Sequence, residues 1–255
     1  SVCSRALNIS TGSMPATRWP RCGPLPQPTS SFTLSQPARY LHSNDGDHVE
    51  TLRLVDSLDA VNQRLKTITD DGVPAWNPAV KEQAEHAIEG GIYRAPDGVW
   101  TRIDFDAVDW NCDKTSNPAH LIMVLRRFHV LGPLAAGYLA TADERYARAA
   151  RRYIEVFLRD HPPVDDWAPV IGDGDTEYEI RANAWMIAIS QFRRSPAWDE
   201  AFIAQMIKAI CGNIRYLSKH VRADRNIRFW HGLVLLLAGI RLEGLPDAAG
   251  WLRQG

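Results

Sequence analysis

The stretch DRNIRFWHGLVLLLAGI, residues 224–240, decides the fold because it is apolar on every side after a polar beginning. A helix that is hydrophobic all round must be covered by other elements on every side, so this segment predicts a helix of the interior. Its first turns nevertheless carry Asn226, Arg228, Trp230 and His231. An ordinary core helix does not need such a polar beginning, which makes the start of this helix a candidate ligand-binding position.

The chain around this stretch alternates between two kinds of predicted helix. Residues 117–141 and 176–192 are apolar on most faces, whereas residues 142–163 and 197–221 each have one apolar and one polar face. Helical hairpins in two layers produce this order directly, with the inner helices running one way and the outer helices running back. We therefore predict an all-α fold, an incomplete (α/α) toroid of helical hairpins with inner and outer layers. An α-solenoid also alternates, but both of its helices usually keep a solvated face.

Other segments predict shorter elements. Residues 77–91 begin with Asn–Pro and end on two glycines, which is typical of a short helix. Residues 50–68 carry apolar side chains at helical spacing, and residues 91–116 are irregular apart from a short extended piece. Pro133 is expected to kink the helix over residues 117–141.

The composition is that of a globular protein, with 255 residues, 45% of them hydrophobic, and a net charge of −1. This charge gives no reason to expect nucleic acid or a membrane surface as a partner, and no apolar run is long enough to span a bilayer. No His or Cys spacing suits a zinc site, so we expect no metal and no cofactor. Nine Trp residues are many for this length, and both carbohydrate-binding clefts and large cores use them.

The first part of the chain has a different composition from the rest. Residues 1–44 contain no Asp or Glu, are rich in Ser, Thr and Pro, and begin with Ser rather than Met. They resemble a transit peptide but lack the apolar core of a secretory signal. We expect residues 1–48 to be a disordered tail, or not to belong to the natural protein, for which Met14 could be the start. Residues 49–255 are then the toroid domain.

Parallel inner helices would bring their N-termini, and the polar residues that open them, to one rim. The first inner helix opens with Asn117 and His120, and the second with Tyr178, Arg181 and Trp185. The unpaired N–H groups of three helix N-termini would attract anions to the same end. We therefore expect an anion-binding site at this rim.

Each of these residues also has a purely structural interpretation. Asn117 and Asn226 are good N-cap residues, and Arg181 could pair with Glu177 one turn away. His231 could be a satisfied core histidine. What favours a site is the shared location of these groups at the helix starts.

Three segments resemble the amino-terminal toroid of heparinase II/III-type polysaccharide lyases. They are DWNCDKTSNPAHLIMVLRRFHVLGPLAAGYLATADERYA (109–147), EYEIRANAWMIAISQF (177–192) and RNIRFWHGLVLLLAGIRLEGLPDAAGW (225–251). The likeness covers roughly residues 75–255. It also suggests a periplasmic or secreted location.

The resemblance implies β-elimination of a uronate-containing acidic polysaccharide or oligosaccharide, of the glycosaminoglycan or alginate type. In that reaction the proton on C5 of the uronate is removed, and hydrogen bonds to the adjacent carboxylate stabilise the intermediate. Asn226 matches the family position that holds this carboxylate, and His231 is the second catalytic candidate. The expected substrate-binding residues are Arg181, Trp185, Trp110, Asn117, His120, Arg228, Trp230 and Tyr178. The tryptophans would stack on sugar faces, and the guanidinium groups would hold carboxylate or sulfate.

The chain departs from the family pattern in several places. Ile227 follows Asn226 where many relatives have His, and Arg126 stands where an Asn is usual. The family's catalytic Tyr lies some fifty residues beyond the Asn, and its partner His lies on a carboxy-terminal β-rich domain. This chain ends at Gly255, and no Tyr follows Asn226. We therefore expect a toroid domain cut short before the β-rich domain, and no activity from the isolated chain.

Two alternatives stay open. An α/α-toroid glycoside hydrolase would need a pair of carboxylates that flank the sugar bond, and Asp175, Glu177 and Glu179 all lie on one segment. A helical scaffold without chemistry would use the polar groups of the rim only as helix caps.

Overall fold

A computed structural model describes residues 73–111, 124–162, 177–220 and 225–255, with the backbone alone for residues 225 and 226. The chain divides into two units, residues 1–36 and residues 37–255, and all of the described residues belong to the second. The predictions of a tail over residues 1–48 and of a helix over residues 50–68 lie outside the described residues.

Helices make up most of the described chain. They are α2 (Pro78–Ile88), α4 (Leu131–Thr141), α5 (Glu144–Asp160), α6 (Glu177–Phe192), α7 (Glu200–Lys219), α8 (Arg225–Arg241) and α9 (Ala248–Gln254). The strands β1 (Gly91–Arg94) and β2 (Trp100–Arg102) form a small antiparallel sheet. Within this part of the chain, no helix has both the length and the apolar character that crossing a lipid bilayer requires.

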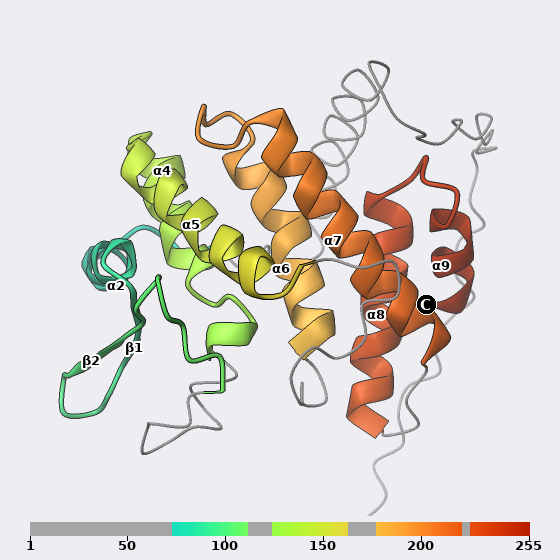
Figure 1. Ribbon diagram of the computed structural model, residues 1–255, viewed down its shortest axis with the longest axis horizontal. Helices are drawn as coiled ribbons and strands as arrows, with labels where there is room; N and C mark the ends of the chain where they lie inside the picture. The colour runs from blue at the N-terminus through green and yellow to red at the C-terminus, as the bar shows by residue number, and fades with distance from the viewer. Residues whose placement is uncertain (1–72, 112–123, 163–176, 221–224) are drawn as a thin grey trace, which may run out of the picture. The chain divides into compact units, whose positions relative to one another are not determined.

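The helices α4, α6 and α8 form an inner layer and run in the same direction (Figure 1). α6 packs against both α4 and α8. Each inner helix is followed by a helix that packs back against it, α5 against α4, α7 against α6 and α9 against α8. The predicted hairpins in two layers are confirmed, and the fold is an incomplete (α/α) toroid.

The hydrophobic pattern explains which helix enters which layer. The amphipathic helix α5 buries one stripe, made of Tyr146, Ala150, Tyr153, Ile154 and Phe157. Its Arg148, on the other side of the helix, is exposed. α6, in contrast, buries residues on nearly every side, from Glu177 to Phe192. A helix of that kind is stable only between neighbours, which is the position that α6 occupies.

The helix α4 begins later than predicted, and the chain breaks before Pro133 rather than kinking at it. Residues 124–126 are helical, residues 127–130 form a turn, and α4 then starts at Leu131. Pro133 is therefore in the first turn of α4, where a missing N–H interrupts no hydrogen bond within the helix. The prediction of a kink at Pro133 was wrong for this reason.

Tertiary packing fixes the turn that replaces the kink. Phe128 in this turn has a φ of 57°, in the left-handed region that a non-glycine residue adopts only when its surroundings hold it there. Its buried ring meets Phe157 and Trp185 edge-on, with ring centroids 5.4 Å and 5.2 Å away. The aromatic core thus holds the backbone in this conformation.

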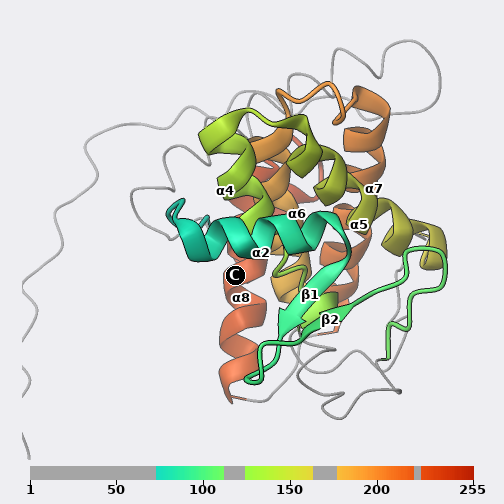
Figure 2. The ribbon, with the colours of Figure 1, turned by 90° about the vertical axis from the view of Figure 1, so that its left-hand side faces the viewer.

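α2 packs against α4 and α5, and the hairpin follows it (Figure 2). The Tyr153 hydroxyl donates to the carbonyl of Ala87 at 3.1 Å, and the Tyr146 hydroxyl donates to the Glu85 carboxylate at 2.7 Å. Burial and the neighbouring Glu85 raise the pKa of Tyr146 to about 12. The stretch that we expected to be irregular therefore contains a hairpin held beside α2, of which the sequence indicated only a short extended piece.

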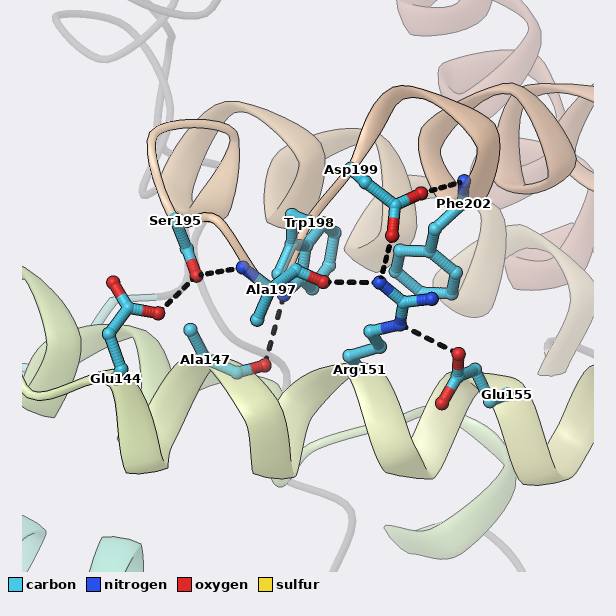
Figure 3. Close-up of polar contacts among 9 residues, drawn as sticks. All are labelled: Glu144, Ala147, Arg151, Glu155, Ser195, Ala197, Trp198, Asp199 and Phe202. Atoms are coloured by element: carbon cyan, nitrogen blue, oxygen red, sulfur yellow. Dashed lines mark hydrogen bonds and ion pairs between the residues drawn. The ribbon is translucent and has the colours of Figure 1, made fainter.

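Polar contacts join α5 to the connection between α6 and α7 (Figure 3). The Trp198 indole donates to the carbonyl of Ala147 at 3.0 Å, and the Arg151 guanidinium donates to the carbonyl of Ala197 at 2.6 Å. Arg151 also pairs with the Asp199 carboxylate, which caps α7. These contacts fix the outer helix α5 to the connection that leads from α6 to α7.

Gly239 permits the close approach of α8 and α9, and its replacement tests this packing. A Cβ at this position would lie 2.6 Å from the backbone nitrogen of Leu252 in α9. Ala normally stabilises a helix interior by about 1 kcal/mol relative to Gly. Because a backbone atom cannot rotate away, we expect Gly239→Ala instead to destabilise the domain by about 1–3 kcal/mol in urea unfolding.

Gly250→Ala in α9 is the matched control, because a Cβ there would meet no atom within 4 Å. We expect this substitution to leave the unfolding midpoint unchanged or to raise it. Equal effects of the two substitutions would contradict the close packing of α8 on α9.

Candidate functional site

The first turns of α6 bury three charged side chains at one end of the inner layer. Glu177, Glu179 and Arg181 are 3%, 2% and 1% exposed. Carboxylates are favourable at a helix N-terminus, but a buried charge is costly unless an opposite charge or hydrogen bonds compensate it. The partners of these groups therefore define what this end of the layer can bind.

Glu177 is compensated by Arg127, which comes from the turn before α4. The Arg127 guanidinium lies 3.1 Å from the Glu177 carboxylate, and the two side chains are 19% and 4% exposed. Salt screens a pair with so little solvent access much less than it screens a surface pair. This ion pair links the turn before α4 to the start of α6.

Arg181 is held by aromatic rings and neutral oxygens. Its guanidinium carbon lies 4.8 Å from the ring centroid of Phe157 and 4.9 Å from that of Tyr178. Its nitrogens donate to the carbonyl of Arg126 and to the side-chain oxygen of Asn213, each at 3.4 Å. The rings therefore contact the guanidinium, and the two oxygens accept hydrogen bonds from its nitrogens, all inside the protein.

Glu179 meets His231 of α8. The Nδ1 atom of His231 lies 3.6 Å from the Glu179 carboxylate, and both side chains are 2% exposed. Glu179 is in the first turn of α6, and His231 is in the second turn of α8. The contact therefore places the starts of these two inner helices side by side.

We call the residues that meet here the buried polar cluster. The cluster consists of the side chains of Arg127, Glu177, Glu179, Arg181, Asn213 and His231, with the backbone carbonyl of Arg126. Its two guanidinium groups, of Arg127 and Arg181, equal its two carboxylates in number, so their formal charges balance. Helix N-termini at the same end of a layer favour anions, and the exposed Arg228 on the first turn of α8 adds a positive charge. Within the described ranges, no group of three or more side chains is arranged to hold a metal ion.

The predicted site residues Arg181, Tyr178 and His231 come together around this cluster. Two of the predicted tryptophans lie beneath it, Trp185 with 0% and Trp110 with 6% of the residue exposed. Both rings pack edge-on against Phe157. Stacking on a sugar requires an exposed ring face, and here these two rings serve the core.

Two other predicted residues are accessible on the first turns of α8. Trp230 is 43% exposed, and Arg228 is also exposed. The neighbouring Phe229 is 66% exposed and lies edge-on to Trp230, with ring centroids 6.0 Å apart. An exposed aromatic pair beside a guanidinium suits a ligand with both apolar sugar faces and anionic groups.

Three predicted residues cannot be placed by their side chains. Asn117 and His120 lie outside the described residues. The backbone of Asn226 lies in the first turn of α8, and its side chain lies outside what the structure describes. The roles expected for them stay predictions.

A family model described as "Heparinase II/III N-terminus" matches residues 60–255. The chain belongs to this family. The resemblance stated from the sequence is thereby confirmed.

Solved structures share the fold of this heparinase II/III N-terminal domain. Heparan sulfate lyase HepC from Pedobacter heparinus aligns with a TM-score of 0.59 and 21% identity, over 70% of this chain and 28% of that chain. A mutant of the same lyase aligns with a TM-score of 0.64 and 18% identity, over 80% of this chain and 33% of that chain. A crystal structure of heparinase III aligns with a TM-score of 0.61 and 15% identity, over 82% of this chain and 35% of that chain. The chain thus spans about a third of the length of these proteins. Among curated proteins, none matches it in sequence.

Arg127 and Asn213 of this heparinase II/III N-terminal domain were not predicted to belong to the site. A signal for both is present in the sequence. Arg127 follows Arg126 in an otherwise apolar segment, and Asn213 interrupts the buried face of α7. A polar side chain on a buried face needs a partner, so such positions point to a polar cluster.

A double-mutant cycle tests the ion pair between Arg127 and Glu177. Glu177→Gln removes the carboxylate that lies 3.1 Å from the Arg127 guanidinium, and Arg127→Met removes that guanidinium. Each substitution is expected to cost about 2–4 kcal/mol. The double variant should lose less than the sum, with a coupling of about 1–3 kcal/mol in urea unfolding.

The pair of Arg102 and Glu89 is the exposed control, at 2.7 Å with side chains 43% and 64% exposed. The cycle of Arg102→Met and Glu89→Gln should give a coupling below about 1 kcal/mol. Additive losses at the buried pair would mean that it does not link the turn before α4 to α6.

Proposed function

We propose that this domain binds a uronate-containing acidic polysaccharide where α6 and α8 begin, as part of a lyase that cleaves the polymer by β-elimination. Membership of the family and the fold shared with a heparan sulfate lyase and heparinase III support this proposal. The observation that carries it is the contact between Glu179 and His231, because it brings the N-termini of α6 and α8 together beside the exposed Arg228 and Trp230.

The reaction needs hydrogen-bond donors beside the uronate carboxylate. Removal of the C5 proton by a base moves negative charge onto this carboxylate. The C4–O bond then breaks, a C4–C5 double bond forms, and the leaving oxygen takes up a proton. Donors already in place stabilise that charge without reorganising. In our proposal the amide of Asn226, in the first turn of α8, donates to the carboxylate, and the N–H groups at the same helix start add to it.

The accessible and the buried residues have different proposed roles. Arg228 and Trp230 contact the polymer directly, the guanidinium through carboxylate or sulfate and the indole through a sugar face. Arg181 and Tyr178 are positioning residues, because they are buried and hold the start of α6. Trp110 and Trp185 are also positioning residues, because their buried rings pack against Phe157. Asn117 and His120 are proposed to contact the polymer.

Binding measurements on matched variants test this proposal. Arg228→Ala and Asn226→Ala should each weaken the binding of a heparan-sulfate-type oligosaccharide about five- to thirtyfold, since each loses a hydrogen bond to a charged group worth about 1–2 kcal/mol. Isothermal titration calorimetry at one fixed salt concentration measures the affinity. Arg148→Ala, on the exposed face of α5, is the control and should bind like the wild type.

The scaffold alternative makes a different prediction for the same variants. If Asn226 is only a helix cap, Asn226→Ala lowers the free energy of unfolding by about 1 kcal/mol and leaves the affinity unchanged. Unchanged affinity in both Asn226→Ala and Arg228→Ala would overturn the proposed site.

We also propose that the 255-residue polypeptide by itself binds the polymer without cleaving it. The family resemblance implies a catalytic Tyr well after Asn226, and the sequence contains no Tyr beyond that residue. Incubation with heparan sulfate, and then with alginate, should give no new ultraviolet absorbance from an unsaturated product. Steady growth of that absorbance would contradict this part of the proposal.

A further inference from the structure

His231 is a buried histidine in an unusual state. The residue is 2% exposed, and neither ring nitrogen has a hydrogen-bond partner in the part of the chain that the structure describes. Buried polar atoms in native proteins are nearly always hydrogen-bonded, so each exception calls for an explanation. This histidine lies where α6 and α8 begin, at the end of the inner layer that the proposed function uses.

Glu179 supplies the partner for one edge of the ring. Its carboxylate lies 3.6 Å from Nδ1, slightly beyond hydrogen-bond distance, and it is itself 2% exposed. Hydrogen bonds of functional groups are often long without ligand and shorten when the ligand binds. A small rotation of either side chain makes Nδ1–H the donor to this carboxylate.

This contact determines the chemistry of the opposite edge. A neutral imidazole that carries its hydrogen on Nδ1 has a lone pair on Nε2. Nε2 is then a buried hydrogen-bond acceptor, and no described residue donates to it. The two residues before it in α8, Phe229 and Trp230, are exposed, whereas the ring of His231 is covered.

We propose that Glu179 and His231 form a dyad that accepts a hydrogen bond from a hydroxyl group of the polysaccharide bound at the starts of α6 and α8. This inference rests on the proposed function and deepens it. Glu179 is the positioning residue, because its carboxylate fixes the tautomer of the ring. His231 is the residue that contacts the sugar, through Nε2, which is covered in the free protein and becomes accessible when the sugar binds.

The dyad selects a neutral donor rather than an anionic group. A lone pair repels a carboxylate or sulfate oxygen, whereas a hydroxyl group can donate to it. The exposed Arg228 on the first turn of α8 takes an anionic group of the same polymer. A polymer that carries a sulfate ester in place of this hydroxyl group loses the donor and is disfavoured. The dyad is therefore a specificity element for the substitution pattern of the sugar.

Two substitutions separate contact with the sugar from support of the fold. His231→Asn keeps an N–H near the position of Nδ1, so Glu179 retains its partner, but it removes Nε2. We expect its affinity for a heparan-sulfate-type oligosaccharide to fall five- to tenfold with an unfolding midpoint close to the wild type. His231→Gln places an amide near the position of Nε2 and leaves Glu179 alone. It should recover part of the affinity and unfold earlier.

A nitrogen-15 NMR spectrum of histidine-labelled protein gives the direct readout. The signals of His231 are those that disappear in His231→Asn. Before addition of ligand they should show the neutral tautomer with the hydrogen on Nδ1, and saturation with oligosaccharide should move the Nε2 signal more than the Nδ1 signal. The matched control is the exposed His220 at the end of α7, whose replacement by Asn should leave the affinity unchanged.

The outcomes separate the dyad from the proposed function. If the wild type binds the oligosaccharide while its Nε2 signal stays in place, or if His231→Asn binds like the wild type, the dyad is structural and the inference is overturned. A wild type that binds no acidic oligosaccharide overturns the proposed function, and the dyad with it.

Discussion

Burial of charge at the start of α6 is the constraint on which the rest of this structure depends. α6 is apolar on nearly every side and therefore lies between α4, α7 and α8. Its first turns enter the interior with it, together with Glu177, Glu179 and Arg181. Each of these charges needs compensation where water is excluded. The turn before α4 supplies Arg127, α7 supplies Asn213, and α8 supplies His231. The starts of the inner helices therefore have to lie together.

The aromatic core supports this polar end from below, through Phe157 of α5. Its ring centroid lies 5.0 Å from Trp110, 5.4 Å from Phe128 and 5.7 Å from Trp185. The guanidinium of Arg181 lies against the same ring at 4.8 Å. One outer helix thus holds both the turn before α4 and the start of α6. The geometry of the buried polar cluster therefore depends on the aromatic packing around Phe157.

The layers could be predicted from the sequence because they follow from hydrophobicity alone. Helices that are apolar all round must be inner, amphipathic helices must be outer, and short connections make neighbours antiparallel. The gathering of Arg181, Tyr178 and His231 follows from helix direction alone. The break before α4 could not be predicted, because it depends on a left-handed Phe128 that distant aromatic rings hold in place.

The sequence also could not predict which residue pairs with Glu177, or which of the candidate tryptophans are buried. A pair of Glu177 with Arg181 is the natural local expectation at a spacing of four residues. In the structure a residue fifty positions earlier, Arg127, meets this carboxylate instead. Residue type also does not tell a tryptophan of the core from one that faces a ligand, and only Trp230 of the three candidates is accessible. Glu177 and Glu179 are both engaged inside the protein, so nothing in their placement favours a hydrolase pair.

The proposal that a polysaccharide binds where α6 and α8 begin is tested most directly by hydrogen–deuterium exchange with and without a heparan-sulfate-type oligosaccharide. A ligand held by both helix starts slows exchange in residues 177–183 and 225–231 together, and leaves α2 and the hairpin unchanged. Slower exchange at only one of the two helix starts, or confined to the outer helices, would contradict the common site.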